Sequence, residues 1–319
     1  MNSNPEVSIV VPVYNASKFL AQGHESLVNQ TYGNLQIVYV DDGSTDDSGR
    51  MLDQFAAADS RVKVIHQANA GTLMARQAGV AATTGDWVTF MDPDDWLENT
   101  AIEELVAAAN ENTEVICFGT TLHGDGGLSA DKLFNIDRYL NPAEGSANIP
   151  ENIWGKFIAG EICRREFAAQ MKIYATFAED IYAFGRLKKT LQYPIKIFPR
   201  RLYHYRLGAG ITANEPISQV KFARMLNALD LAKDLPELEE KLVGDFLELV
   251  FDRGGENLAQ SEKLRALQAK CRPEMLTTVL GKWRRQLVEQ GEYITEVVRA
   301  LVDLRSRAWV KIGHKMGVA

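Results

Sequence analysis

The sequence predicts an α/β fold: a mostly parallel sheet with helices on both faces, followed by a C-terminal α-helical region. Strand-like and helix-like stretches alternate over residues 7–120, and helical crossovers between successive strands produce parallel sheets. The strand-like stretches are short and nearly all apolar, which is typical of strands buried on both faces. After about residue 216, Leu, Ala, Glu, Lys and Arg dominate with helical spacing, which indicates a separate helical domain.

Each expected strand is a run of apolar, mostly β-branched residues that ends at a polar or glycine-containing turn. We expect strands at residues 7–13, 35–40, 62–65, 87–91 and 115–118. The intervening helices are expected at about 17–30, 46–58, 71–83 and 100–110. Asp46 or Asp47 can cap the second of these helices through its side-chain oxygen.

The pattern is less regular beyond residue 120. Residues 121–150 are rich in Gly, Asn and Pro, so we expect a long loop or a connection to a second layer there. Further short strands are expected at 193–197 and 202–205, where β-formers recur.

These patterns divide the chain into a first domain at 1–215, with halves at 1–120 and 121–215, and a helical domain at 216–319. The helical domain is expected to hold four or five helices, interrupted by Pro and Gly. Its last helix carries Arg and Lys beside an apolar stripe. That helix could pack on its own bundle, contact an anionic membrane surface or pair with a second copy.

The composition excludes several classes of protein. The chain has 319 residues and a net charge of -7, which argues against a general nucleic-acid binder. No apolar run reaches the roughly 20 residues of a membrane span, and the first residues lack the pattern of a signal peptide. The 3 cysteines are far apart, so we expect reduced, packed thiols and a cytoplasmic protein.

Carboxylates are crowded directly after the expected strand at 87–91, in the segment Asp92-Pro93-Asp94-Asp95. Crowded carboxylates repel one another, so such a cluster at a strand end indicates a positive partner. Mg²⁺ and Mn²⁺ prefer hard oxygen ligands and leave room for phosphate oxygens. The alternative is a polar turn in which Asp94 or Asp95 caps a helix beginning near Leu97.

Other polar segments also follow expected strands. Tyr14-Asn15, Asp41-Asp42 and Asn69-Ala70-Gly71 each lie at such a position. Ligands of parallel sheets bind beyond the carboxyl ends of the strands, so we expect these segments to share one edge with the aspartates. For Asp41-Asp42-Gly43-Ser44 the alternative is a simple turn with a helix cap.

Four segments resemble, in order and spacing, the family 2 glycosyltransferases of the GT-A fold. They are Pro12-Val13-Tyr14-Asn15, Val40 to Asp46, Asn69-Ala70-Gly71 with Arg76, and Asp92 to Asp95. The resemblance covers residues 5–120 and continues more loosely to about 213. There, Glu179-Asp180 resembles the catalytic acidic pair of the family. Tyr203-His204-Tyr205-Arg206 with Gly210-Ile211-Thr212 resembles the segment that closes over the diphosphate.

The resemblance implies transfer of a sugar from a nucleoside diphosphate sugar, most often a UDP-sugar, with inversion at the anomeric carbon. Mn²⁺ or Mg²⁺ is the implied cofactor. Residues 1–120 would form the nucleotide-binding half and residues 121–215 the acceptor half. Bacterial members of this kind often build surface polysaccharides, so the expected acceptor is a glycan or a lipid-linked or other polymer.

The resemblance also implies roles on the donor side. Residues 12–15 and Asp42 would cradle the base, with Asp41 beside it as support. Gly71 would allow a close approach of the backbone, and Arg76 would steady the base or the pocket. Asp92, followed by Pro93, would bind the ribose or the edge of the metal site.

Further implied roles concern the diphosphate. Asp94 would ligate the metal ion, with Asp92 and His204 as further candidate ligands. Arg206, together with His204 and Thr212, would meet the diphosphate, whose developing charge a guanidinium and a divalent ion can stabilise.

The acidic pair supplies the remaining chemistry. Asp180 would be the general base that takes the proton of the acceptor hydroxyl, and Glu179 would orient the acceptor. Inversion by direct displacement places the base opposite the leaving group, so a segment separate from the metal ligands suits this role.

Each assignment has a structural alternative. Glu179 and Asp180 could be a solvated helix start, Arg76 a helix-surface ion pair, and Arg206 a stacked structural arginine. Trp154 is expected in the core. For the whole chain, the alternative is a non-catalytic nucleotide-sugar- or carbohydrate-binding module on the same fold.

Overall fold

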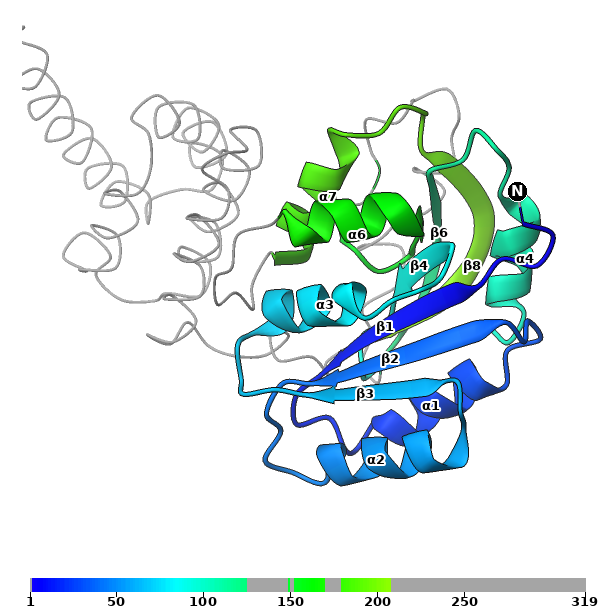
Figure 1. Cartoon of the computed structure of the whole chain (residues 1–319). Helices are drawn as coiled ribbons and strands as arrows, with labels where there is room; N and C mark the ends of the chain where they lie inside the picture. Colours follow the sequence, from blue (N-terminus) through cyan, green and yellow to red (C-terminus); the bar gives the residue numbers. More distant parts are fainter. Residues whose placement is uncertain (1, 125–148, 150–151, 170–178, 208–319) are drawn as a thin grey trace, which may run out of the picture. The chain divides into compact units, whose positions relative to one another are not determined.

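Figure 1 shows a computed structural model of the chain, which describes residues 2–124, 149, 152–169 and 179–207. The chain divides into two compact units, Met1–Asn214 and Glu215–Ala319, and the described residues all belong to the first. Thr212 and the expected helices of 216–319, with their proposed membrane or dimer contacts, lie outside the described residues. Within the part of the chain described, no helix is long and apolar enough to cross a membrane.

The first unit is built on an eight-stranded sheet with the order β3-β2-β1-β4-β7-β6-β8-β5. The four strands of its first half are parallel neighbours: β1 (Val7–Val13), β2 (Leu35–Asp41), β3 (Val62–His66) and β4 (Trp87–Phe90). The second half is mixed in direction: β5 (Trp96–Leu97), β6 (Val115–His123), β7 (Lys156–Ala159) and β8 (Lys196–Arg206). The predicted α/β architecture is confirmed.

The register of the parallel strands aligns their carboxyl ends. Val13 pairs with Asp41, and Asp41 pairs with His66, so β1, β2 and β3 end side by side. On the other side of β1, Val10 pairs with Phe90 at the end of β4. This edge of the sheet therefore collects the polar segments that follow these strands.

Helices cover both faces of the sheet, so β1, β2 and β4 are buried on both sides. The apolar residues of α1 (Leu20–Val28), α2 (Ser48–Ala58) and α4 (Ala101–Ala108) pack in one core cluster. On the opposite face lie α3 (Thr72–Ala81), α6 (Gly160–Ala168) and α7 (Glu179–Lys188), which share other clusters with the sheet (Figure 1).

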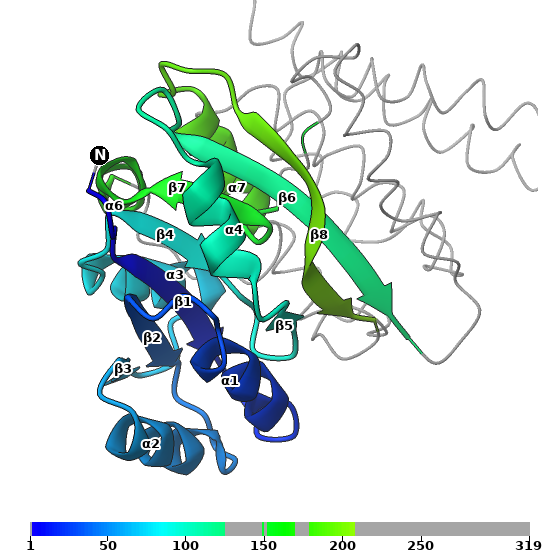
Figure 2. The ribbon, with the colours of Figure 1, turned by 90° about the vertical axis from the view of Figure 1, so that its right-hand side faces the viewer.

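The structure differs from the predicted elements mainly around β8. This strand is one continuous element rather than two short ones, and it runs beside β6, which extends beyond residue 118 to His123 (Figure 2). A register shift around Gly119 accommodates the pairing. Long-range pairing of this kind leaves no local signal in the sequence.

No helix begins near Leu97, so the cap expected from Asp94 or Asp95 is wrong. Trp96 and Leu97 instead form β5, which pairs antiparallel with β8, and α4 begins only at Ala101. The cap expected before α2 is confirmed in part, because the Asp46 carboxylate accepts the backbone N–H of Ser48 at 2.9 Å.

Candidate active site

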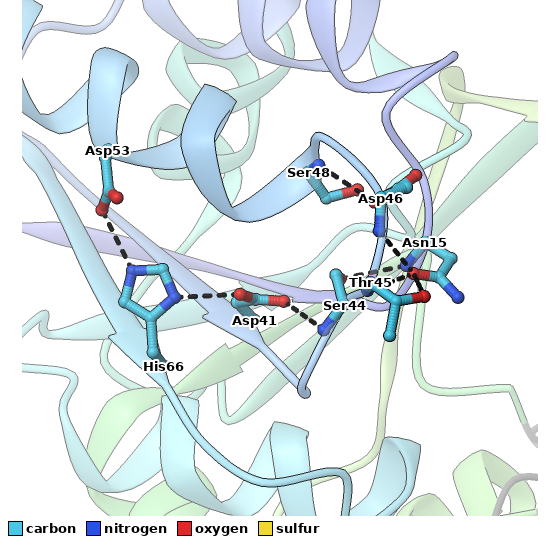
Figure 3. A network of polar contacts seen from close by, with 8 residues as sticks. All are labelled: Asn15, Asp41, Ser44, Thr45, Asp46, Ser48, Asp53 and His66. Carbon is cyan, nitrogen blue, oxygen red and sulfur yellow. Dashed lines mark hydrogen bonds and ion pairs between the residues drawn. The ribbon is translucent and has the colours of Figure 1, made fainter.

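The turns after β1 and β2 are joined by a polar network (Figure 3). The side-chain oxygen of Asn15 accepts the backbone N–H groups of Thr45 at 2.7 Å and Asp46 at 3.3 Å. The backbone N–H of Asn15 donates to the Ser44 hydroxyl at 3.0 Å. Asn15 has a φ of 50°, in the left-handed region that asparagine tolerates better than most residues. The asparagine of the predicted nucleotide-binding segment thus shapes the neighbouring loop.

Asp41 links this network to the third strand. Its carboxylate accepts the backbone N–H of Ser44 at 2.9 Å and contacts a ring nitrogen of His66 at 2.9 Å. Burial opposes ionisation of Asp41, but the hydrogen bonds from Ser44 and His66 outweigh it and lower the pKa of this carboxyl. Asp41 is therefore an ionised carboxylate whose charge is used inside the protein.

Asp42 holds the segment that leads into α3. Its carboxylate accepts the backbone N–H groups of Ala70 at 2.8 Å and Gly71 at 2.9 Å, and the side-chain amide of Gln67 at 2.7 Å. Gly71 has a φ of 88° and a ψ of 160°, a conformation essentially restricted to glycine. Asp42 and Gly71, which the sequence assigns to the donor pocket, thus lie in direct contact.

Carboxylates crowd the loop after β4, as the sequence predicts. Burial and the neighbouring charge of Asp92 raise the pKa of Asp94 to about 6. Burial and the charges of Asp92 and Asp94 raise the pKa of Asp95 to about 9. The surroundings of this loop therefore disfavour the ionised forms of Asp94 and Asp95.

Asp95 has a structural contact that the sequence did not indicate. Its carboxylate accepts the Tyr203 hydroxyl at 2.7 Å and the backbone N–H of Arg206 at 2.8 Å, both from β8. The Tyr203 oxygen in turn accepts the backbone N–H of Asp92 at 3.0 Å. Asp95 therefore ties the aspartate loop to β8, which follows more than a hundred residues later.

Arg76 connects three segments of the chain. From α3, its guanidinium donates to Asp92, after β4, at 2.9 Å and to Glu179, at the start of α7, at 2.9 Å. The Arg76 side chain is only 4% exposed, so the expected alternative of a helix-surface ion pair is wrong. Its ε nitrogen is buried without a hydrogen-bond partner among the described residues.

At the start of α7, Glu179 is buried and Asp180 is partly buried. Burial raises the pKa of Glu179 to about 7, with the Asp180 charge adding to the shift and Arg76 opposing it. Burial also raises the pKa of Asp180, again against the effect of Arg76. The alternative of a solvated helix start is therefore wrong for Glu179. Its carboxylate binds Arg76, whereas Asp180 accepts the backbone N–H of Ile181 at 2.8 Å.

Arg206 lies against the aspartate loop. It donates to the Asp94 carbonyl oxygen at 3.0 Å and to the Gln22 side chain, and its guanidinium lies 5.0 Å from the Trp96 ring and 5.3 Å from the Phe19 ring. The predicted diphosphate ligand thus contacts the aspartate loop, and the aromatic neighbours of the alternative, a stacked structural arginine, are also present.

His204 is engaged away from the aspartates. One ring nitrogen contacts Glu98 at 2.8 Å, the other contacts His123 at 2.8 Å, and the ring stacks on Trp96. Among the described residues, no group of three or more His, Cys, Asp and Glu side chains is arranged to hold a metal ion. The structure therefore does not assemble the expected set of Asp92, Asp94 and His204, because both nitrogens of His204 already have partners.

The remaining expected positions are simpler. Pro12 and Val13 are buried in β1, Tyr14 is 39% exposed, and Pro93 is partly buried between its aspartates. Trp154 packs in the core and stacks on Tyr203, as predicted. His66 was missed, although its position at the end of the third expected strand was a signal for it.

Comparisons with known proteins agree with this arrangement. The family model described as "Glycosyl transferase family 2" matches residues 8–170. The chain is 38% identical over 120 residues to glycosyltransferase GlyG of Streptococcus pneumoniae, a match that covers 37% of this chain and 40% of GlyG. The chain therefore spans about two-fifths of the length of this curated relative.

Two kinds of solved structure share the fold. The Staphylococcus aureus protein TarS (1-349), crystallised with UDP-GlcNAc, matches with a TM-score of 0.66 and 16% identity, over 98% of this chain and 92% of TarS. The mannosyltransferase PcManGT of Pyrobaculum calidifontis, in complex with GDP-Man and Mn²⁺, matches with a TM-score of 0.52 and 16% identity, over 97% of this chain and 84% of that one. The fold is thus of the GT-A type, and the chain belongs to glycosyltransferase family 2.

Proposed function

We propose that this chain is a metal-dependent, inverting glycosyltransferase that moves a sugar from a UDP-sugar to a hydroxyl group of a glycan or other surface polymer. The observation that carries the proposal is the double ion pair of Arg76, with Asp92 on one side and Glu179 on the other. It places the acidic pair of α7 beside the aspartates that follow β4. Candidates for the donor, metal and base roles thus share one site.

The donor side rests on the loops after β1, β2 and β3. Asn15, Asp41, Asp42 and Gly71 form or support a rigid rim at the carboxyl edge of the sheet, where such folds bind nucleotides. A base and ribose at this edge would pack against Tyr14, whose side chain is exposed. TarS with UDP-GlcNAc supports a uridine nucleotide, and PcManGT with GDP-Man supports a nucleoside diphosphate sugar in general.

The metal side rests on Asp94 and Asp92. Their oxygens fit Mn²⁺ or Mg²⁺, which need only one or two carboxylates when phosphate oxygens complete the shell. The raised pKa of Asp94 agrees with this role, because a nearby cation would offset the cost that burial and the charge of Asp92 place on the ionised carboxylate. The ion would stabilise negative charge on the leaving diphosphate. Arg206, at the Asp94 carbonyl, would add a guanidinium to the same task.

The base in this proposal is Asp180. It lies on α7, a separate element from the loop of Asp92 and Asp94, as displacement with inversion requires. Its raised pKa brings the carboxylate closer to the pH at which a general base works best. Glu179 holds the pair in place through Arg76 and would orient the acceptor. A polymer acceptor follows from the resemblance to bacterial enzymes that build surface polysaccharides.

Binding and hydrolysis of UDP-, GDP- and dTDP-sugars, each with Mn²⁺, Mg²⁺ or chelator, test the proposal. We expect metal-dependent binding of one UDP-sugar and its slow hydrolysis without acceptor. Tight binding of a nucleotide sugar without turnover, even with a panel of glycan acceptors, would favour the non-catalytic binding module. Equal binding with metal and with chelator would contradict the metal-dependent part.

A further inference from the structure

His66 lies at the end of β3 with a carboxylate at each ring nitrogen (Figure 3). Its δ1 nitrogen is 2.9 Å from an oxygen of Asp41, on β2, and its ε2 nitrogen is 3.0 Å from an oxygen of Asp53, on α2. The His66 and Asp53 side chains are 48% and 66% exposed, whereas the Asp41 side chain is 9% exposed. The half-exposed imidazole of His66 thus contacts the buried Asp41 carboxylate through its δ1 nitrogen.

This geometry selects the protonated form of the ring. An ionised carboxylate only accepts hydrogen bonds, so a ring nitrogen facing one must carry a proton. Both nitrogens of His66 face carboxylates, and only the imidazolium carries a proton on each. The two hydrogen bonds accordingly raise the pKa of His66, although its partial burial opposes the shift.

The contact of His66 with Asp41 continues into the loop after β2. The second oxygen of Asp41 accepts the Ser44 N–H, and the Ser44 hydroxyl accepts the Asn15 N–H. Asn15 in turn holds the N–H of Thr45. A single line of hydrogen bonds therefore runs from His66 at the surface to Asn15 at the nucleotide edge.

The packing of α2 leaves room for this arrangement. A Cβ atom on Gly49 would lie 2.9 Å from the Asp41 oxygen that faces His66, and 3.7 Å from the His66 ring. A Cβ atom at this position would have to displace the Asp41 carboxylate, whereas its distance from the His66 ring is an ordinary contact. Glycine at this position of α2 thus preserves the contact between Asp41 and His66.

We propose that the His66 imidazolium is a positioning residue for the donor nucleotide, which it never touches, and that it makes donor affinity fall as the pH rises. The proposal rests on the proposed function, because it assumes that the nucleotide binds the loop shaped by Asn15 and Ser44. The imidazolium draws Asp41 into the orientation that holds the Ser44 N–H. Loss of its second proton leaves a carboxylate facing a lone pair, and the loop loses one of its restraints.

The direction with pH follows from the groups that face the ring, Asp41 from β2 and Asp53 from α2. Both favour the charged ring, so its pKa lies above the ordinary value for histidine. Below that pKa the line of hydrogen bonds is complete. Above it the neutral ring can donate to only one of its two carboxylates and its bond to Asp41 loses the charge of the ring, so the effect weakens as the pH rises through the raised pKa of His66.

Isothermal titration of UDP with Mg²⁺ tests the proposal from about pH 6 to about pH 9, across the range in which a raised histidine titrates. The full-length variants are His66→Gln, which cannot be protonated, and Asp53→Asn, which removes the exposed carboxylate only. Asp47→Asn is the matched control, since it removes an exposed carboxylate directly before α2 that pairs with Arg50 and not with His66. Dividing each variant's Kd by the wild-type Kd at the same pH cancels the titration of UDP itself.

We expect His66→Gln to weaken UDP binding about three- to tenfold near pH 6, the size of one partly exposed charge-assisted hydrogen bond. The ratio should approach one at the basic end. Asp53→Asn should move the transition to lower pH, and Asp47→Asn should follow the wild type throughout. A His66→Gln ratio that stays constant with pH would overturn the proposal, because a merely structural role has no such dependence.

Proton titration of the His66 ring by NMR, together with the backbone amide of Ser44, needs no nucleotide. Both signals should titrate with one raised pKa in the wild type, and the Ser44 transition should vanish in His66→Gln. A Ser44 amide that ignores the ring would overturn the positioning role. If the wild type bound no UDP at any pH, the proposed use of a UDP-sugar would be contradicted. The NMR titration alone would then test whether the His66 ring positions the Ser44 loop.

Discussion

The carboxylates after β2 and those after β4 lie at the same edge of one sheet but are treated in opposite ways. Asp41 and Asp42 accept backbone N–H groups from the loops around them, and the pKa of Asp41 is lowered. Asp95 is buried and Asp94 is partly buried, each beside another carboxylate, and their pKa values are raised. The hydrogen bonds of Asp41 thus outweigh the cost of its burial and favour its ionised form, whereas burial and crowding disfavour the ionised forms of Asp94 and Asp95.

This difference separates carboxylates that stabilise a loop from carboxylates that are suited to bind a cation. A carboxylate that already holds backbone amides gains little from a further partner, because its charge has been used to fix a loop. A crowded and desolvated carboxylate gains a great deal from a cation. The loop after β2 is thus suited to shaping a rim, and the loop after β4, with the acidic pair of α7, is suited to the chemistry. The following predictions test this division, beginning with the largest effect.

Asp180→Asn should reduce sugar transfer by about 10²–10⁴-fold, because the acceptor hydroxyl loses its general base. Donor binding should be retained, since Asp180 lies outside the loops of the nucleotide edge. Steady-state transfer and nucleotide titration measure the two effects. A variant that transfers sugar at the normal rate would show that another group is the base.

Arg76→Met should lower the free energy of unfolding by about 3–5 kcal/mol, because it leaves the buried Glu179 and the partly exposed Asp92 without their cation. The loss should be smaller at acidic pH, where Glu179, with its pKa raised to about 7, is neutral. Urea unfolding at basic and acidic pH measures both.

The matched control is Arg50→Met, which breaks a 3.2 Å pair with Asp47 in which the two side chains are 62% and 68% exposed. It should cost far less than Arg76→Met, because exposed pairs contribute little to stability. Similar losses for the two variants would contradict the special place of Arg76 between the two clusters.

Asp94→Asn should make the metal-free protein more stable at basic pH, by about 1–3 kcal/mol for a pKa raised by some two units in a partly exposed group. The sign follows because a raised pKa means that folding disfavours the ionised form, so stability falls as pH rises through about 6. Asp41→Asn should act in the opposite direction. Its lowered pKa contributes stability above the ordinary range of aspartate, which is lost as pH falls through the lowered value.

Urea unfolding in chelator gives both signs, and donor titration with Mn²⁺ adds a second readout. Asp94→Asn should lose the metal-dependent part of donor binding. If both variants destabilised the protein equally at basic pH, the contrast between the two carboxylate clusters would not hold.

Asn15→Ala should destabilise the protein by about 1–2 kcal/mol, since alanine loses the side-chain acceptor and resists a φ of 50°. Asn15→Gly loses the same acceptor but adopts this φ freely, so it should cost about 1 kcal/mol less. Thermal or urea unfolding compares the two. Equal costs would mean that the hydrogen bonds to Thr45 and Asp46, and not the backbone conformation, explain the asparagine.

The first half of the fold was predictable because its signals are local. The strand expected at 7–13 is observed at Val7–Val13, and the one expected at 62–65 at Val62–His66. Apolar, β-branched runs between helical patterns are sufficient for such strands. In the second half the sequence indicated strands at 115–118, 193–197 and 202–205 but not their extent, and it missed β5. These strands depend on pairing between Trp96 and His204, or between Cys117 and Ile197, far apart in the chain.

The site shows the same division. Its segments were predicted from their places after strands, and the family that they indicated is confirmed. Their mutual contacts were not predicted. Arg76 was expected near the base, and the structure places it between Asp92 and Glu179. His204 was expected at the metal, and the structure engages it with Glu98 and His123.

The sequence by itself determined the fold class, the family and the edge of the sheet at which the candidate site residues gather, because these follow from periodicity and from short motifs at strand ends. Only the tertiary structure decided which charges are balanced and which are not. Ionisation depends on burial and on partners within a few ångströms, and those partners come from segments as distant as residues 76 and 179. The contacts of His66 with Asp41 and Asp53 could not be predicted for the same reason, because they form only when β2, β3 and α2 pack together.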